Sequence, residues 1–103
     1  MKYLVSWKTR FDGSAAENEA SAARILDVYN KWTPEPDVTI HQFVLRADGQ
    51  GGFAVTESDN PTAGVLTNFK LSPFVEYTVY PVLDIEEGVG LYAEAVEWRK
   101  SIT

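Results

Sequence analysis

The chain has 103 residues, a mass of 11.5 kDa and a formal net charge of −6, with 45% hydrophobic and 23% charged residues. This length suits one domain over residues 1–103 and excludes two compact domains, and the composition excludes a disordered chain. Because the chain has no cysteine, disulfides, thiolate metal sites and cysteine nucleophiles are excluded as well.

The nine basic residues are scattered along the chain among fifteen acidic ones. Binding to a phosphate backbone needs a clustered positive patch, so we expect no nucleic-acid partner. No apolar run approaches the roughly 18 to 20 residues of a membrane span. The N-terminal segment MKYLVSWKTR lacks the long apolar region and the small-residue cleavage site of a signal peptide. We therefore expect a cytoplasmic protein with no membrane partner.

A strand and a helix are predicted at the N-terminus. Residues 2–8 alternate between two sides, as a β-strand does. One side carries Tyr3, Val5 and Trp7, and the other carries Leu4 and Ser6. Ser14 and Glu17 have the spacing of a capping box, which marks the start of a helix, although Asn18 could equally serve as the cap. Apolar residues at helical spacing continue that helix through residue 32, and Pro34 ends it.

The middle of the chain predicts a hairpin followed by a second helix. Residues 38–45 and 52–57 read as strands, joined by a tight turn at Asp48-Gly49. Asn60 followed by Pro61 is typical of a helix N-terminus, because asparagine caps helices and proline is tolerated at the first helical position. We expect this helix to cover residues 61–70.

The last third predicts a strand and a C-terminal helix. The strand covers residues 75–83, and Pro81 within it indicates an edge strand, because proline has no amide hydrogen to donate to a neighbour. Glu86 and Glu87 favour a helix N-terminus that follows it. The apolar stripe of this helix is formed by Val89, Tyr92, Ala93 and Val96.

The order strand-helix-strand-strand-helix-strand-helix predicts an α+β ferredoxin-like βαββαβ fold with an extra C-terminal helix. In that fold the antiparallel sheet has the strand order 4-1-3-2, and the helices cover one face. The second face would expose more apolar area than a solvated face usually carries, from residues such as Leu4, Phe43, Leu45, Tyr80 and Val82. We therefore expect a homodimer in which the sheets face each other.

Four segments, KYLVSWKTR, TIHQFV, GGFAVTESDNP and PVLDIEE, are distributed along nearly the whole chain. With these segments the chain resembles a family of short bacterial proteins that is described as a domain of unknown function. The resemblance implies a dimeric α+β barrel, in which ferredoxin-like protomers pair sheet to sheet around a cavity. Proteins with such barrels include cofactor-free monooxygenases, isomerases, haem-degrading enzymes and ligand-binding modules. The resemblance implies no catalytic residues, and a fold alone does not identify a function.

Five residues on the second sheet face are candidates for a ligand site: His41, Phe43, Tyr80, Ser6 and Thr56. The only histidine, His41, has a side chain that titrates near neutral pH. An apolar cavity with a few convergent hydroxyl groups and one imidazole is typical of a small-molecule site, and also of a half-polar dimer core. A one-residue bulge in a strand would move its candidates to the helix side.

Three functions stay open. The first is a homodimeric small-molecule binding or regulatory module with a cavity between the facing sheets. The second is a small cofactor-free enzyme of oxygenase or isomerase type that uses His41 as acid or base. The third is a structural or interaction protein with a filled dimer core. We expect no cofactor and no metal, because one histidine with scattered carboxylates is a poor set of zinc ligands.

Overall fold

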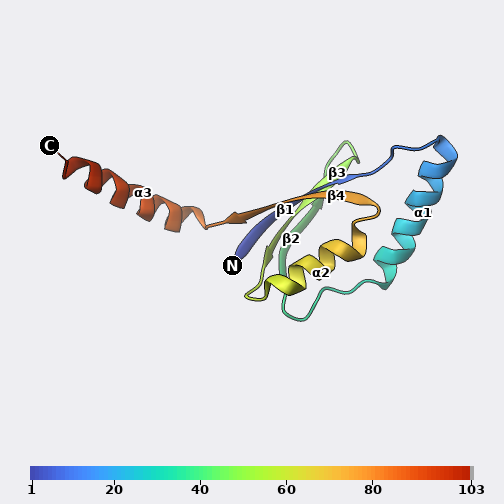
Figure 1. Ribbon diagram of the computed structural model, residues 1–103, viewed down its shortest axis with the longest axis horizontal. Helices are drawn as coiled ribbons and strands as arrows, with labels where there is room; N and C mark the ends of the chain where they lie inside the picture. The colour runs from blue at the N-terminus through green and yellow to red at the C-terminus, as the bar shows by residue number, and fades with distance from the viewer. Residues whose placement is uncertain (103) are drawn as a thin grey trace.

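The computed structural model of the protein describes residues 1–102. Its helices and strands follow the order predicted from the sequence (Figure 1). They are β1 (Lys2–Thr9), α1 (Ala15–Lys31), β2 (Thr39–Leu45), β3 (Gly51–Glu57), α2 (Pro61–Leu71), β4 (Val75–Val82) and α3 (Ile85–Lys100).

The four strands form one antiparallel sheet in the order β2-β3-β1-β4, which is the predicted ferredoxin-like order. β1 is an inner strand, and its Val5 lies opposite Ala54 of β3 and Val79 of β4. β4 is an edge strand, as Pro81 indicated. α1 and α2 lie on the same side of the sheet, so that the α+β ferredoxin-like fold is confirmed (Figure 1).

Local sequence signals fix the helix starts. The Ser14 hydroxyl accepts a hydrogen bond from the Glu17 amide, and the Glu17 carboxylate accepts one from the Ser14 amide, both at 3.2 Å. This is the predicted capping box of α1. At α2, the Asn60 side chain accepts a hydrogen bond from the Thr62 amide at 3.1 Å. Both helices therefore begin where the sequence predicted.

A β-bulge in β2 decides which of its side chains face the helices. Ile40 lies opposite Thr56 and Gln42 lies opposite Val55, so that His41 is the extra residue. Phe43, opposite Ala54, therefore faces the helices, and so does Leu45. The expectation that Phe43 lies on the second face is wrong, because the bulge reverses the alternation of β2.

The enclosed part of the molecule is small. Its buried hydrophobic side chains are Ala54, Ala63 and Val75, and its buried polar side chain is Ser58. These are small side chains, whereas the aromatic residues of the sheet and of α1 stay partly exposed. The space between the sheet and its helices is therefore not filled by a close-packed core.

Helix α3 stands clear of the sheet and of the other helices (Figure 1). The molecule measures 66 × 30 × 20 Å, and its radius of gyration is 18.4 Å. A compact chain of this length has a radius of gyration of about 13 Å. All α3 residues except Gly88 and Val96 are exposed. Over residues 1–102, no helix combines the length and the hydropathy of a membrane span.

Candidate functional site

An apolar cavity lies between the helices and the inner face of the sheet, which we define as the face toward α1 and α2. Its volume is about 650 Å³. The sheet side of the cavity includes Val5, Trp7, Phe43, Ala54, Tyr77 and Val79. The helix side includes Ile25, Leu26 and Tyr29 of α1, Trp32 at its end, and Val65 and Leu71 of α2. The cavity is thus formed by both layers of the fold.

Four aromatic rings run from the sheet to the end of α1 along this cavity. Trp7 and Phe43 meet edge to face, with ring centroids 5.1 Å apart. The ring of Tyr29 lies 6.4 Å from that of Phe43 and 6.1 Å from that of Trp32. Aromatic pairs at such distances are favourable and directional, so that they position α1 over β2.

Gly52 of β3 makes room for the first of these rings. It lies opposite Trp7 in the sheet. A Cβ atom at Gly52 would lie 2.3 Å from two carbons of the Trp7 indole, which is far inside van der Waals contact. The indole therefore lies directly against the Gly52 backbone, and only glycine fits there.

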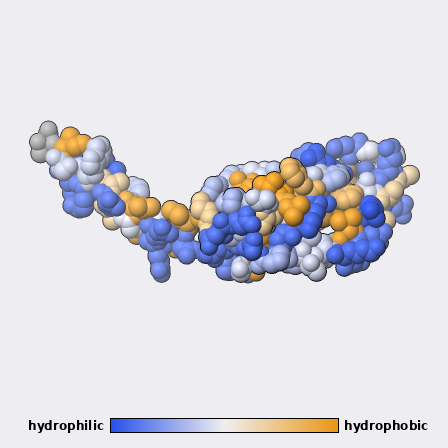
Figure 2. All heavy atoms as spheres, turned by 60° about the horizontal axis from the view of Figure 1, so that its bottom comes forward, coloured by the Kyte–Doolittle hydropathy of each residue, from blue (hydrophilic) through white to orange (hydrophobic). Residues whose placement is uncertain are grey.

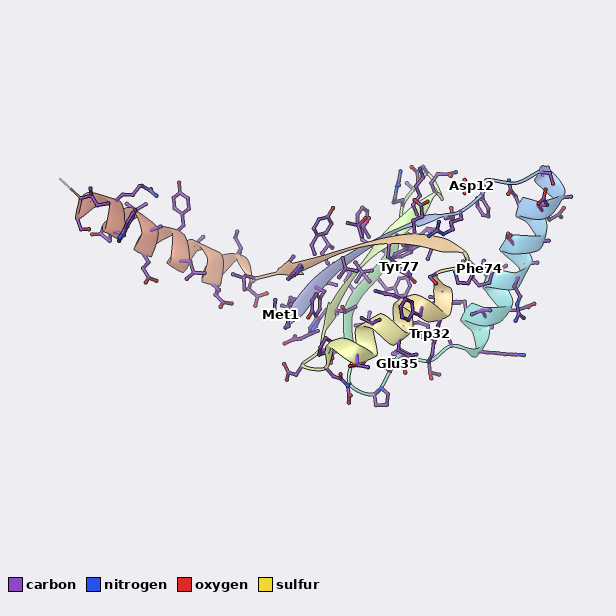
Figure 3. All side chains as sticks on the ribbon, in the orientation of Figure 1. Met1, Asp12, Trp32, Glu35, Phe74 and Tyr77 are labelled. Carbon is purple, nitrogen blue, oxygen red and sulfur yellow. The ribbon has the colours of Figure 1, made fainter. Side chains whose placement is uncertain are left out.

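Two polar groups of the cavity, the Tyr77 phenol and the Trp32 indole N–H, are removed from solvent. Burial raises the pKa of the Tyr77 phenol to about 12. The indole nitrogen Nε1 of Trp32 is buried and donates no hydrogen bond to any described residue. In Figure 3 both side chains point into the space between the sheet and α2. A buried N–H without an acceptor costs free energy, so that an acceptor atom entering the cavity would be stabilised there.

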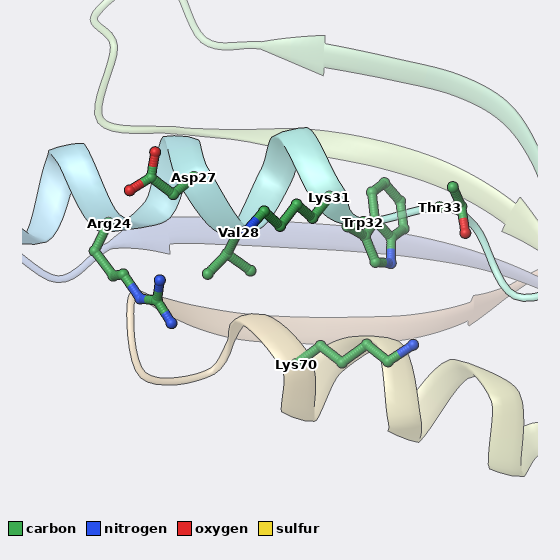
Figure 4. A pocket seen from close by; sticks show the side chains of 7 residues that line it. All are labelled: Arg24, Asp27, Val28, Lys31, Trp32, Thr33 and Lys70. Carbon is green, nitrogen blue, oxygen red and sulfur yellow. The ribbon is translucent and has the colours of Figure 1, made fainter.

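A second hollow of about 340 Å³ opens between α1 and α2. Figure 4 shows Arg24 and Lys31 of α1 on one side of it and Lys70 of α2 on the other. The Lys70 ammonium lies 2.6 Å from a carboxylate oxygen of Glu35. Trp32 contributes to both hollows, so that the basic opening and the apolar cavity adjoin.

The apolar cavity is open to solvent along its helix side. Leu26 and Val65 both face it, yet their side chains are 62% and 50% exposed. Figure 2 shows the corresponding hydrophobic surface between polar regions of the molecule. The two helices therefore line the sides of the cavity, and no described element covers the opening between them.

The outer face of the sheet, which points away from the helices, carries a charged cluster. The His41 ring nitrogen Nε2 lies 2.7 Å from a carboxylate oxygen of Glu57. The Lys2 ammonium lies 2.6 Å from a carboxylate oxygen of Asp84, at the start of α3. The hydrogen bond from Lys2 holds the pKa of the Asp84 carboxyl below its usual value, with smaller attractions from the charges of Lys2 and His41. Neither His41 nor Glu57 lines a described hollow.

The five residues that the sequence suggested do not share a face. Phe43 and Thr56 line the inner cavity. Thr56 lies opposite Tyr3 and so faces the helices, which corrects the expectation that it lies beside Ser6. Ser6, opposite Thr78, and Tyr80, two residues further along β4, stay on the outer face. The bulge residue His41 reaches Glu57 on that face.

The cavity residues of α1 and β4 carry no sequence motif that predicts more than a structural role. Tyr29 and Trp32 are among the apolar residues at helical spacing that predicted α1. The alternation of β4 was visible too, but the distance between α1 and the sheet was not. That distance depends on packing between elements that are far apart in the sequence. Only the structure could show that these residues line an open space.

The chain holds few further signs of chemistry. Over residues 1–102, no three histidine, aspartate or glutamate side chains come together to hold a metal ion. The family model DUF3303, described as a domain of unknown function, matches residues 1–96. The match reaches from β1 into α3 and so includes the whole cavity. No curated protein matches the chain.

Proposed function

We propose that this chain, which belongs to the DUF3303 family, a domain of unknown function, is a homodimeric module that binds an apolar small molecule. The observation that carries the proposal is the cavity of about 650 Å³ on the inner face of the sheet. Ligand pockets commonly measure about 300 to 1,000 Å³ and have apolar walls with a few polar groups. This cavity fits that description.

The polar groups favour a ligand with one hydrogen-bond acceptor. The unpartnered Nε1 of Trp32 would donate to a carbonyl, hydroxyl or carboxylate oxygen. The hollow that adjoins the cavity at Trp32 is lined by Arg24, Lys31 and Lys70 against one carboxylate, Asp27, and this excess of cations favours an oxygen that carries negative charge. The rest of the ligand would lie against Phe43 and Val79. The proposed ligand is therefore an apolar body with one polar end.

The sequence suggested a cavity between two facing sheets, and we propose the inner face instead. The outer face carries the charged cluster of Lys2, His41 and Glu57 at one end. Val44 and Phe53 of this face and Tyr92 of α3 are exposed, and this amount of apolar surface supports the proposal of a second copy. The homodimer and the ligand are thus two separate parts of the proposal.

The ligand part is tested with the fluorescent probe anilinonaphthalene sulfonate, which has an aromatic body and one anionic group. Gly64 of α2 lines the cavity, and a Cβ atom there meets nothing within 4 Å. The Cβ atom of Gly64→Leu therefore meets no neighbour, and we expect the rest of the side chain to occupy part of the cavity. We expect it to weaken probe binding at least tenfold, which corresponds to about 1.4 kcal/mol.

The matched control is Gly90→Leu on α3, where an added Cβ atom also meets nothing within 4 Å. This control adds the same side chain outside the cavity, and we expect it to bind the probe as the unchanged protein does. Equal binding by Gly64→Leu and the unchanged protein would contradict the cavity as the ligand site. A probe at 100 times its dissociation constant should also stabilise the fold by about 2.7 kcal/mol.

A further inference from the structure

Helix α3 has an apolar stripe with nothing packed against it. Ile85, Val89, Tyr92 and Val96 follow one another at intervals of four, three and four residues, which places them on one side of the helix. The Tyr92 side chain is 69% exposed. Among residues 1–102, the hydrogen bonds and ion pairs of residues 85–100 stay within the helix and its caps. A helix of this kind needs a partner surface.

The same molecule has an apolar groove that lacks a helix. The groove is the open side of the cavity between α1 and α2, where Leu26 and Val65 are exposed. α3 has 16 residues and α1 has 17, so that both are roughly 25 Å long. Each chain therefore has one helix with no packing partner and one uncovered groove of similar length.

The charges of the two surfaces are complementary. Glu86, Glu87, Glu94 and Glu97 give α3 an excess of acid over its two cations. Arg24 and Lys31 line the hollow that adjoins the groove, together with the carboxylate of Asp27, and neither cation forms an ion pair with any described residue. In contrast, Lys2 and Arg46, which flank the outer face, already have carboxylate partners. Because the glutamates lie on the side of α3 away from its apolar stripe, the attraction acts at long range and steers α3 toward the groove without direct ion pairs.

A chain cannot easily place α3 in its own groove. Only Leu83 and Asp84 connect β4 to α3. Asp84 is held by the Lys2 ammonium at 2.6 Å, and α3 leaves the sheet at the end of β4 and points away from α1 (Figure 1). Reaching the inner face of the same sheet would require a reversal within these two residues. The groove of another copy has no such restriction.

The exposed area has the size that a stable dimer buries. The surface area of the chain is 7602 Å². A compact chain of this mass exposes about 5,800 Å², so that the excess is about 1,800 Å². Two copies that each bury this excess would bury about 3,600 Å², within the roughly 2,000 to 5,000 Å² of obligate homodimers.

From these observations we infer that α3 of each copy packs into the groove between α1 and α2 of a second copy. Each copy places its α3 in the groove of the other. In this two-fold symmetric dimer both helices are packed and both grooves are occupied. α3 then covers its partner's cavity with its apolar stripe, and its glutamates stay on the solvent side of the helix. This inference rests on the homodimer of the proposed function and not on its ligand.

The absence of cysteine allows a direct test by cross-linking. A chain with Leu26→Cys is mixed with a chain with Val89→Cys, and a short bismaleimide is added. We expect the covalent heterodimer as the main product, because Leu26 lies in the groove and Val89 lies on the stripe. When both substitutions are in one chain, we again expect covalent dimers. A monomer with an internal cross-link would show that α3 folds back on its own chain and would overturn the exchange.

A third cysteine position distinguishes the groove from the outer face. Thr78 is exposed and lies on the outer face opposite Ser6. If Val89→Cys reacts with Thr78→Cys in place of Leu26→Cys, α3 binds the outer face and the groove assignment is wrong. Efficient linkage of Thr78→Cys to itself, without linkage of Leu26 to Val89, would support facing sheets and also overturn the inference.

The strength of the contact is tested with one substitution placed on two sides of α3. Val89→Asp puts a charge on the apolar stripe, whereas Gly90→Asp puts the same charge on the side of the helix that Glu94 and Glu97 occupy. By sedimentation equilibrium we expect Val89→Asp to raise the dimer dissociation constant at least 100-fold and Gly90→Asp to change it little. A dimer unaffected by Val89→Asp would contradict the inference, while probe binding reports separately on the ligand.

Discussion

The imidazole of His41 and the carboxylate of Glu57 are 2.7 Å apart, on the face of the sheet opposite the cavity. The bulge at His41 makes this pairing possible, because it leaves the histidine outside the regular alternation of β2. The His41 side chain is 41% exposed, and exposed pairs of this kind contribute little to stability.

We therefore expect His41→Gln to lower the free energy of unfolding by less than about 1 kcal/mol. It should also leave binding of the fluorescent probe unchanged, because His41 does not line the cavity. Urea denaturation and a probe titration measure the two quantities. Loss of probe binding in His41→Gln would place the ligand on the outer face and return His41 to the site.

Gly52 is a position where a single methyl group has a large expected effect on the fold. The Cβ atom of Gly52→Ala would lie 2.3 Å from the Trp7 ring, so that the indole must move and the aromatic contact with Phe43 must change. Overpacking of this kind costs about 1 to 3 kcal/mol. Thermal unfolding measured by circular dichroism should show a lower Tm.

Gly64→Ala is the control for that measurement. Its added Cβ atom meets nothing within 4 Å, and alanine favours a helix over glycine by up to about 1 kcal/mol. We expect this variant to be as stable as the unchanged protein or more stable. If Gly52→Ala were equally well tolerated, the close approach of Trp7 to the β3 backbone would not constrain the sheet.

Tyr77 predicts a loss of stability at alkaline pH. Burial raises the pKa of its phenol to about 12, whereas the usual value is 10.0. The unfolded chain therefore releases the phenol proton first, and the contribution of Tyr77 to stability is complete below pH 10.0. It is lost as the pH rises from 10.0 toward about 12.

The measurement is the free energy of unfolding as a function of pH, for the unchanged protein and for Tyr77→Phe. We expect the substitution to make the alkaline decrease less steep, because phenylalanine keeps the ring and removes the titrating group. The same decrease in both proteins would mean that Tyr77 is not the group responsible. Absorbance of the phenolate follows the titration directly.

The lowered pKa of Asp84, which lies between β4 and α3, predicts a loss of stability at acid pH. The hydrogen bond from Lys2 holds the pKa of the Asp84 carboxyl below 3.8, so that its contribution is present above pH 3.8 and is lost as the pH falls through the lowered value. A carboxyl titration by NMR should show this lower pKa. In Lys2→Met we expect the pKa of Asp84 to rise toward 3.8, because methionine neither donates the hydrogen bond nor carries the charge that lowers this pKa.

The parts of the fold that depend on neighbouring residues were predictable from the sequence. The capping box of Ser14 and Glu17 and the cap at Asn60 each involve a few consecutive residues, and both lie where the sequence predicted. The strand order followed from the order of elements, because the ferredoxin-like pattern has one usual topology. Pro81 identified an edge strand because proline lacks the amide hydrogen that an inner strand needs.

The candidate site depended on relationships between distant residues, and there the prediction was partly wrong. The side on which Phe43 lies depends on a bulge that no local motif marks. The side on which Thr56 lies depends on its pairing with Tyr3, more than fifty positions away in the sequence. The apolar stripe of α3 was visible in the sequence, but its separation from the sheet was not, because periodicity shows which side of a helix is apolar and not what covers it.

Both edges of the sheet oppose the addition of another strand. At one edge, Pro81 of β4 has no amide hydrogen to offer an incoming chain, and at the other edge the bulge at His41 distorts the hydrogen-bonding row of β2. A neighbouring molecule would therefore find it difficult to extend the sheet into a fibril. Association through faces and helices stays open, so that the protein can expose apolar surface for a partner while discouraging edge-to-edge aggregation.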